Sequence, residues 1–243
     1  MCIYNIMIIN KDCFEYLSEI SDNSIDLILT DPPYSISRQS NFDKFSTKAS
    51  DKMITKYSTH SIDFGYWDID FDIDKLISEY YRVLRKGGTL IIFYDIWKSS
   101  QIKLIAEKYK FKQPRIGTWV KNNPTPINSK VNYLSNSCEY FFSFVKDKKP
   151  TFNSKYDNGI YNYPLCHGKE RLDHPTQKPL GLINMIIEKH SNEGDIVLDT
   201  FSGSGTTAES CILLDRKFIC IERDINYYNI SIDRIKKYKI END

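Results

Sequence analysis

The chain has 243 residues, of which 41% are hydrophobic and 27% are charged. These values are ordinary for a soluble globular protein, and the length allows one domain with a substantial buried core. No apolar stretch approaches the roughly 18 residues of a membrane span, and no basic segment with a long apolar core opens the chain, so we expect no membrane association and no signal peptide.

The predicted elements alternate between strands and helices along the chain. Strands are expected at 3–9, 25–29, 89–93, 117–120, 140–145, 195–199 and 217–222, and helices at 12–17, 73–84, 96–109, 180–190, 205–214 and 224–239. Gly87-Gly88 is expected to end the helix 73–84. This alternation predicts an α/β fold in a single domain of 1–243, with a mostly parallel sheet and helices on both faces.

Two polar segments without periodicity interrupt this pattern, at residues 35–65 and 146–172. An unstructured stretch as long as 35–65 is usually functional or mobile, so we expect a mobile loop there. The segments around them are also basic: five Lys or Arg against two Asp or Glu in 35–60, and eleven against four in 110–171, although the whole chain carries only +1. Such concentration is typical of contact with nucleic-acid phosphates, and solvated lysine-rich loops are the alternative.

Six cysteines occur without a C-x-x-C pair, and the four histidines are scattered. This pattern predicts reduced thiols in a cytoplasmic protein and no metal site.

The most informative motif is Asp31-Pro32-Pro33-Tyr34, which follows the apolar run 25–29. Two consecutive prolines cannot continue a strand, because each lacks an N–H and has a fixed φ. In an open α/β sheet the ligand crevice lies outside the carboxyl ends of the strands. The motif therefore predicts a stiff loop at that edge, which presents a carboxylate and an aromatic ring to a flat, nitrogen-bearing substrate.

A glycine-rich turn follows the apolar run 196–198 and reads Asp199-Thr200-Phe201-Ser202-Gly203-Ser204-Gly205-Thr206-Thr207. Glycines let the backbone approach a ligand closely, and the helix that follows offers free N–H groups at its start. The next strand, 218–221, ends in Glu222, and an acid about 20 residues after such a loop often holds ribose hydroxyls. The sequence therefore predicts a site for a nucleoside-bearing cofactor.

With both motifs in this order, the chain resembles the beta class of S-adenosylmethionine-dependent DNA amino-methyltransferases, especially the small adenine-specific enzymes of bacterial restriction–modification systems. The family's catalytic motif, (D/N/S)-P-P-(Y/F/W), corresponds to residues 31–34, and its cofactor motif, F-x-G-x-G, to residues 201–205. The catalytic motif comes first, which is the circularly permuted arrangement of that class. The resemblance covers essentially the whole chain and includes three further stretches, 82–93, 119–124 and 174–179.

The resemblance implies a Rossmann-like methyltransferase fold and transfer of a methyl group to the exocyclic N6 of adenine in double-stranded DNA. The carboxylate of Asp31 and the carbonyl of Pro32 would accept the two amine hydrogens, on a loop stiffened by Pro33. Tyr34 would stack on the base face. Since a paired base cannot be reached, the target must be flipped out of the duplex.

The same resemblance implies which residues contact the cofactor. Asp199 would accept from the ammonium group of the methionine portion, Phe201 would pack against the ligand, and Glu222 would bind the ribose. For both acids, capping of the following helix is the alternative role. The remaining expected contacts of the loop are Gly203, Ser204, Gly205, Thr206 and Thr207.

Outside this loop, Asp12 and Cys13 are implied to border the adenine pocket, and Lys178 to lie near the methionine carboxylate. His174 could simply brace the turn beside Pro175.

Four alternatives stay open. Residues 203–208 also match a dinucleotide fingerprint, which suggests an NAD-dependent dehydrogenase, although only 35 residues follow Ala208 and residues 31–34 are left unexplained. A catalytically silent DNA-binding subunit is disfavoured by the intact Asp31 and both loop glycines. An N4-cytosine enzyme would use the same mechanism, but Asp at the first motif position is typical of adenine enzymes; RNA as the substrate stays open.

Target recognition is expected from residues 120–172, helped by the loop 35–60. Asn122 and Asn123 could read adenine edges, and Arg38, Arg115 and Arg171 could read guanine or contact phosphate, as could Lys44 and Lys121. We expect a short target. Whether a cognate restriction endonuclease exists, and whether the protein is a monomer or a homodimer, stays open at this point.

Overall fold

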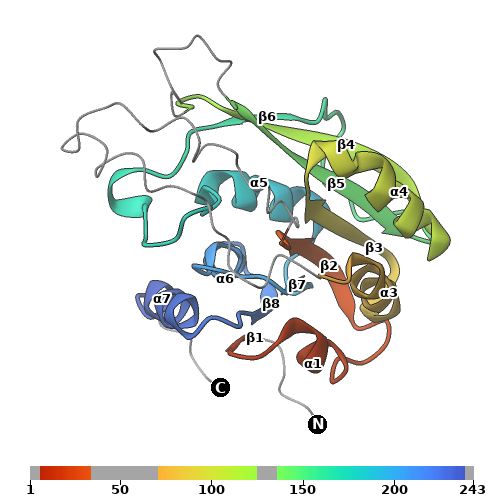
Figure 1. Cartoon of the computed structure of the whole chain (residues 1–243), viewed down its shortest axis with the longest axis horizontal. Helices are drawn as coiled ribbons and strands as arrows, with labels where there is room; N and C mark the ends of the chain where they lie inside the picture. Colours follow the sequence, from red (N-terminus) through yellow and green to blue (C-terminus); the bar gives the residue numbers. More distant parts are fainter. Residues whose placement is uncertain (1–5, 34–70, 125–135, 239–243) are drawn as a thin grey trace, which may run out of the picture. The chain divides into compact units, whose positions relative to one another are not determined.

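The computed structural model describes residues 6–33, 71–124 and 136–238. The predicted loop 35–65, including Arg38 and Lys44, and the motif residue Tyr34 lie outside the described residues. The predicted α/β architecture is confirmed for the described part (Figure 1). Among these residues, no helix is long and apolar enough to cross a membrane.

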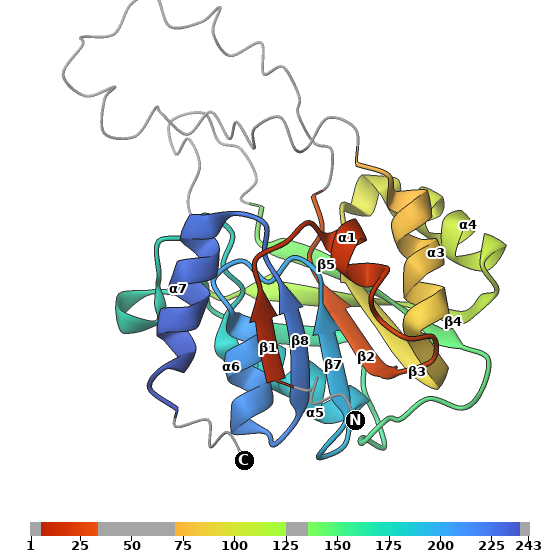
Figure 2. The same cartoon turned by 90° about the horizontal axis from the view of Figure 1, so that it is seen from below.

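One eight-stranded sheet forms the centre of the described structure, in the order β1-β8-β7-β2-β3-β5-β4-β6. Only β5 runs antiparallel to its neighbours. Figure 2 shows β1, β8, β7 and β2 side by side. The strands span Ile6–Ile9 (β1), Ile25–Thr30 (β2), Leu84–Phe93 (β3), Phe111–Lys121 (β4), Cys138–Lys146 (β5), Ile160–Tyr163 (β6), Ile196–Asp199 (β7) and Lys217–Ile221 (β8).

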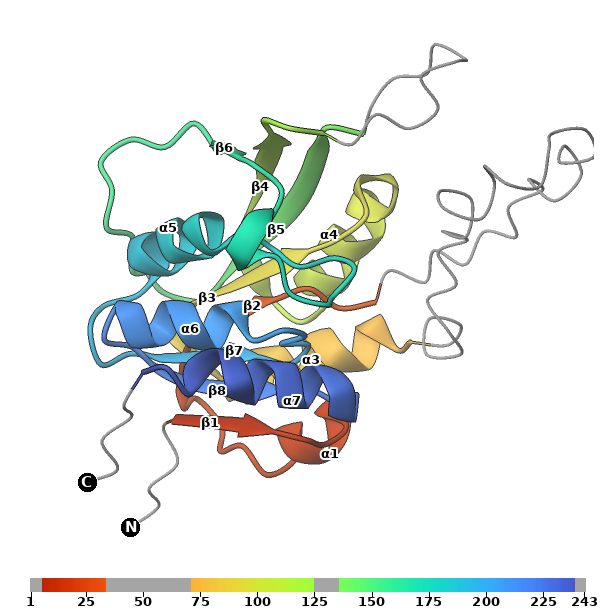
Figure 3. The same ribbon diagram turned by 90° about the vertical axis from the view of Figure 1, so that its left-hand side faces the viewer.

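Helices cover both faces of this sheet. In Figure 2, α1 and α3 lie in front of the strands, and α5 and α6 lie behind them. Helix α6 packs between α5 and α7 (Figure 3). The helices span Cys13–Leu17 (α1), Ile73–Val83 (α3), Ser99–Lys108 (α4), Leu180–His190 (α5), Thr206–Leu213 (α6) and Ile225–Ile235 (α7), with 3-10 turns at Ile96–Lys98 (η3) and Gly168–Glu170 (η4).

The core is formed by the central strands and the helix faces that pack on them. Leu27, Ile28 and Leu29 of β2 are buried, as expected for a strand that has neighbours on both sides and helices on both faces. Tyr80 of α3 and Phe93 of β3 are among the largest fully buried side chains. The apolar runs of the sequence are therefore the strands that carry the site.

The region around Gly87-Gly88 differs from the prediction. Helix α3 ends at Val83, and β3 begins at Leu84, before the glycine pair. The register between β2 and β3 shifts there, because Ile25 pairs with Leu84 but Leu27 pairs with Thr89. A side chain at Gly88 would lie 2.8 Å from the Leu84 side chain, so glycine permits this bulge.

Other element boundaries were also predicted imperfectly. Strands β4 and β5 are longer than expected, the predicted helix 96–109 begins as a 3-10 turn, and α7 ends at Ile235 instead of near 239. Strand β6 was missed because it lies within the polar segment 146–172. It is a short edge strand in which only Tyr161 is buried, so it lacks the alternating apolar pattern of a half-buried strand.

Candidate active site

The strands that carry the two sequence motifs end at the same edge of the sheet. Thr30, the last residue of β2, pairs with Ile92 of β3, and the preceding residues of β2 pair with β7. The hydroxyls of Thr30 and Thr200 are 3.3 Å apart. The structure therefore brings Asp31 and the glycine loop (residues 200–205) together, although 168 residues separate Asp31 from Asp199.

A partly open cavity lies between these two segments. Asp31, Lys178 and Asp199 line it, and His174 and Phe93 contribute to its wall. The residues of the glycine loop and of the first turn of α6 that line it are Ser202, Gly203, Ser204, Thr206 and Thr207.

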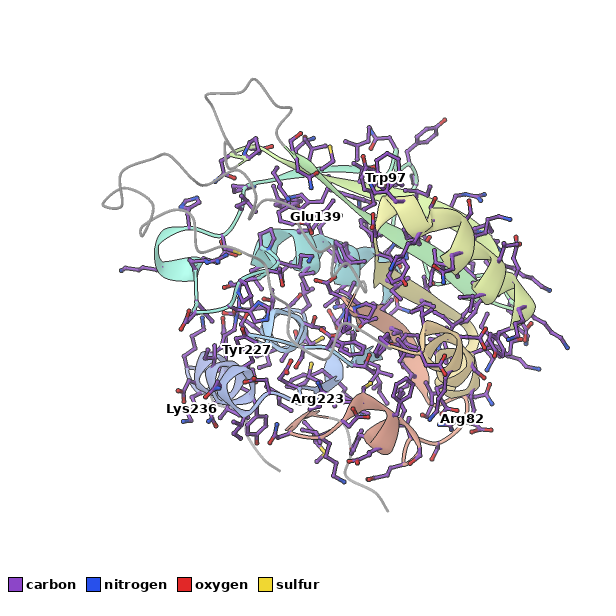
Figure 4. All side chains as sticks on the ribbon, in the orientation of Figure 1. Arg82, Trp97, Glu139, Arg223, Tyr227 and Lys236 are labelled. Carbon is purple, nitrogen blue, oxygen red and sulfur yellow. The ribbon has the colours of Figure 1, made fainter. Side chains whose placement is uncertain are left out.

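Asp31 is held by an ion pair in this cavity. The Lys178 ammonium contacts Oδ2 of Asp31 and lies 3.2 Å from the carboxylate of Glu139. Glu139 belongs to β5 and is labelled in Figure 4. The side chain of Lys178 is only 10% exposed. Burial disfavours its charge, but the two carboxylates outweigh burial and raise the pKa of Lys178. Lys178 was expected near the methionine carboxylate, which stays a prediction; in the structure its ammonium lies between two protein carboxylates and its residue lines the cavity.

Glu139 extends this charge arrangement toward β4. Lys121 lies 2.8 Å from Glu139, so positive and negative groups alternate from Lys121 through Glu139 and Lys178 to Asp31. Burial opposes ionisation of Glu139, but the two lysines lower its pKa. Lys121 was a predicted DNA contact, yet its side chain is only 11% exposed and paired within the protein, an arrangement that does not favour a phosphate contact.

The glycine loop is constrained by its own strand-end acids. Thr207 donates to Oδ2 of Asp199 at 2.6 Å, and the backbone N–H of Phe201 donates to Oδ1 at 3.1 Å. Asp199 is buried, which raises its pKa to about 6. The backbone N–H of Gly203 donates to Glu222 at 2.8 Å, and the N–H of Asp224 donates to the other Glu222 oxygen at 2.8 Å. Both acids therefore organise the backbone around the cavity.

The two loop glycines have left-handed backbones, for which glycine is the favoured residue. Gly203 has φ +51°, and a side chain there would lie 2.7 Å from Nε2 of His174. Gly205 has φ +78°, and a side chain there would lie 2.8 Å from Ser231 of α7. Gly205 therefore also allows α7 to pack closely, and its predicted role in close approach to a cofactor stays a prediction.

Two buried polar atoms at the cavity have no hydrogen-bond partner among the described residues, Nδ1 of His174 and Oγ of Ser202. The His174 ring packs edge-on against Tyr227, with ring centres 4.4 Å apart. Tyr227 belongs to α7 and is labelled in Figure 4. Burial lowers the pKa of His174 to about 4, so the imidazole is neutral near pH 7. Buried polar atoms usually have partners, and a bound ligand would supply them here.

Asp12 and Cys13 begin α1, directly after the end of β1. Asp12 caps the helix by accepting from the Phe14 N–H at 2.9 Å, and it lies 3.8 Å from Arg223. Burial raises the pKa of the Cys13 thiol to about 12, so it is a neutral group. Since β1 pairs with β8, both residues are at the same edge of the sheet as Glu222.

The remaining predicted DNA contacts that lie within the described residues are exposed. Asn122 and Asn123 follow β4, and Asn123 accepts from the Leu165 N–H at 2.6 Å. Arg115 lies on β4 and Arg171 follows η4. Arg115 donates to the carbonyl of Pro114 and Arg171 to the carbonyl of Pro175. Each guanidinium has five N–H donors, so further donors remain for a partner.

Sequence reasoning missed Glu139 and Arg234. A lone acid inside the aromatic strand Cys138–Lys146 is a signal that could have identified Glu139. Arg234 donates to the loop residue Ser204 and to Thr206, and pairs with Glu209, but nothing in the local sequence distinguishes it from the other charges of its helix.

A mostly parallel sheet whose carboxyl edge joins a glycine loop, a strand-end acid and a carboxylate followed by prolines defines a Rossmann-like methyltransferase. The sequence model of a family described as DNA methylase matches residues 25–233, and the chain belongs to this family. The predicted resemblance is thereby confirmed, and the dehydrogenase alternative is excluded.

Individual proteins agree with this assignment. The Type II methyltransferase M2.MboI of Moraxella bovis is 32% identical over 93% of this chain and 86% of its own length. The crystal structure of the M1.HpyAVI–SAM complex is similar with a TM-score of 0.72 and 30% identity, over 95% of this chain and 99% of that one. PvuII DNA methyltransferase, described as cytosine-N4-specific, has a TM-score of 0.72 at 16% identity, over 97% of this chain and 88% of that one, and therefore shares the fold.

Proposed function

We propose that this DNA methylase transfers the methyl group of S-adenosylmethionine to the exocyclic N6 of an adenine that has been flipped out of a short duplex target. The observation that carries the proposal is that Asp31 and the glycine loop line one cavity. A substrate amine at Asp31 and a cofactor on the loop would therefore share this cavity.

The residues present fit S-adenosylmethionine. The left-handed Gly203 and Gly205 form a turn whose residues line the cavity, and the unpartnered Nδ1 of His174 and Oγ of Ser202 offer polar contacts. Asp199, Phe201 and Glu222 are proposed to bind the methionine ammonium, the ligand face and the ribose. When bound, the cofactor supplies an electrophilic methyl group on a sulfonium centre.

The chemistry asked of the protein is to activate a poor nucleophile. The lone pair of an aromatic amine is delocalised into the ring, and acceptors that hold its two hydrogens restore its availability. We assign one acceptor to the Asp31 carboxylate and the other to the Pro32 carbonyl, with Tyr34 stacking on the base. With the cofactor bound, the amine nitrogen would form its bond to the methyl carbon as the carbon–sulfur bond breaks, the electron pair of that bond would stay on sulfur, and the nitrogen would lose one proton to water.

Lys178 and Glu139 are proposed to position Asp31 for this step. A carboxylate next to a buried ammonium stays in one orientation, because leaving the ammonium unpaired in the protein interior is costly. Preorganised acceptors do not have to reorient during the reaction, which lowers its barrier.

The second candidate is N4-cytosine methylation. PvuII DNA methyltransferase shares the fold and is described as cytosine-N4-specific, so the fold alone does not choose the base. The aspartate at position 31 favours adenine, since it is typical of adenine enzymes in the family that the motif order resembles.

The proposed biological setting is restriction–modification in the cytoplasm, with a cognate endonuclease that cuts the same site when it is unmethylated. The similarity to a Type II methyltransferase supports this proposal. Whether the working form is a monomer or a homodimer can be measured by sedimentation.

The test is transfer from tritiated S-adenosylmethionine to unmethylated genomic DNA, followed by nucleoside analysis. N6-methyladenine supports the proposal, and mapping the modified sites gives the target. N4-methylcytosine would replace adenine by cytosine and keep the mechanism. Transfer to RNA but not to DNA would contradict the proposed substrate.

A further inference from the structure

A buried ion pair lies next to the glycine loop, outside the cavity. Arg234 of α7 contacts Glu209 of α6, and their side chains are only 5% and 4% exposed. Neither residue lines the cavity, and methyl transfer as described above uses neither charge.

Arg234 binds the loop as well as Glu209. Its Nε contacts Glu209, and its Nη1 donates to Oγ1 of Thr206 at 2.9 Å and to the carbonyl of Ser204 at 3.3 Å, with the Ser204 hydroxyl at 3.4 Å. The planar guanidinium makes this combination possible, because its donors diverge in a rigid fork. One side chain therefore connects α7, α6 and the end of the glycine loop.

Thr206 links Arg234 to Lys178, whose ammonium contacts Asp31. Its hydroxyl, which accepts from Arg234, lies 3.3 Å from the carbonyl of Lys178 and donates to it. The ammonium of Lys178 in turn contacts Asp31. Arg234 is thus connected to Asp31 by the hydrogen bonds of Thr206 and by the side chain of Lys178.

The two oxygens of Glu209 have different partners, and Arg234 contacts one of them. Lys237 lies 2.5 Å from Oε1, and Tyr238 donates to the same oxygen at 2.8 Å, while Arg234 contacts Oε2. Burial disfavours the Glu209 charge, but the bonds from Lys237 and Arg234 outweigh it and lower its pKa. The carboxylate therefore stays ionised and holds Arg234 in place.

Packing alone does not account for this pair. A buried ion pair is often no more stabilising than apolar side chains of similar volume. What apolar side chains cannot supply is a donor to the Ser204 carbonyl and the Thr206 hydroxyl. The geometry therefore favours a role in shaping the loop over a role in stability.

We propose that Arg234 is a positioning residue for the cofactor: it fixes the Ser204–Thr206 end of the glycine loop and, through Thr206, the backbone of Lys178. This inference rests on the proposed function, because it assumes that the loop binds the cofactor. Loss of the Arg234 contacts lowers cofactor affinity without a matching loss of stability.

The experiment compares four proteins: the wild type, Arg234→Lys, the paired change Arg234→Met with Glu209→Leu, and Lys237→Met. Lysine keeps a positive charge opposite Glu209 but lacks the divergent N–H donors of the guanidinium. The paired change replaces the ion pair by apolar groups. Lys237→Met is the matched control: Lys237 is 59% exposed and contacts the other oxygen of Glu209, so its loss leaves the contact of Arg234 with Oε2 and the bonds of Arg234 to Ser204 and Thr206 in place. The readouts are the dissociation constant of S-adenosylhomocysteine by calorimetry and the midpoint of thermal unfolding.

Arg234→Lys and the paired change are expected to weaken binding about tenfold, which corresponds to one hydrogen bond from a charged donor. Lys237→Met should bind like the wild type, and the paired change should unfold within a few degrees of it. Unchanged affinity in Arg234→Lys and in the paired variant overturns the proposal, and so does an equal loss in Lys237→Met. If the paired variant does not fold, Arg234→Lys decides. Absence of binding by the wild type would instead overturn the cofactor assignment itself.

Discussion

The ammonium of Lys178 contacts the carboxylate of Asp31, a residue 147 positions earlier in the chain. The contact joins the turn before α5 to the end of β2, and Glu139 adds a second carboxylate from β5. The carboxylate that we propose to be catalytic thus contacts, directly or through Lys178, residues from different parts of the chain, and each of these contacts can be removed separately by mutation.

Replacing Asp31 tests its assigned role as acceptor. Asp31→Ala should reduce methyl transfer at least about a hundredfold, the usual effect of removing one preorganised hydrogen-bonding group from an active site. Cofactor binding, measured by calorimetry, should remain, because the glycine loop is untouched. Transfer within a few fold of the wild-type rate would contradict the role.

Removing the charge of Glu139 tests the positioning of Lys178. In Glu139→Gln the ammonium has Asp31 as its remaining carboxylate partner among the contacts described above, so it binds Asp31 more tightly and competes with the substrate amine. The single-turnover rate should fall about tenfold, the effect of one hydrogen bond to a charged group, while cofactor affinity stays the same.

The matched control for Glu139 is Glu107→Gln, which removes the same charge from an exposed pair with Lys103 on α4. It should leave the rate unchanged. If Glu139→Gln weakens cofactor binding and leaves the rate intact, Glu139 acts on the cofactor site and not on Asp31.

Alanine substitutions at Gly205 and Gly194 distinguish the effect of backbone strain on stability from the effect of steric crowding. Both have a left-handed backbone, with φ of +78° and +77°, but a side chain at Gly205 would meet Ser231 at 2.8 Å, whereas nothing lies within 4 Å of one at Gly194. Gly194→Ala should lower the free energy of unfolding by about 1 kcal/mol, and Gly205→Ala by about 1–3 kcal/mol more, in urea titrations. Equal losses would mean that α7 moves aside without cost.

Cofactor binding should depend on pH through Asp199. Burial raises the pKa of this carboxyl to about 6 in the free protein, and only the ionised form attracts the methionine ammonium. Affinity for S-adenosylmethionine should therefore be constant near pH 7 and fall as the pH drops below about 6. His174, whose pKa is about 4, stays neutral in that range.

The control for this dependence is Asp199→Asn, measured by calorimetry between pH 5 and 7. It should bind weakly at every pH, with a flat profile, because the titrating group is gone. A wild-type profile that is flat over the same range would contradict the assigned contact.

Much of the fold follows from local patterns. The apolar runs 25–29 and 196–198 became β2 and β7, and the helical spacing of 73–84 became α3, because burial of these side chains requires the periodicity that the sequence displays. Strand β6 and the bulge at Gly87-Gly88 were not predicted correctly. A short edge strand and a register shift depend on what the neighbouring strands offer, which a local pattern does not contain.

The sequence by itself determined the class of the protein, since the two motifs and their permuted order are stretches of adjacent residues whose chemistry can be read directly. Only the tertiary structure decided the partners of the charged groups. Lys178 pairs with Asp31 and Glu139, Lys121 is turned inward, and Arg234 supports the loop from α7. Ion pairs and hydrogen bonds act over a few ångströms in space, and residues far apart in the sequence come within that range only after the sheet and its helices have packed.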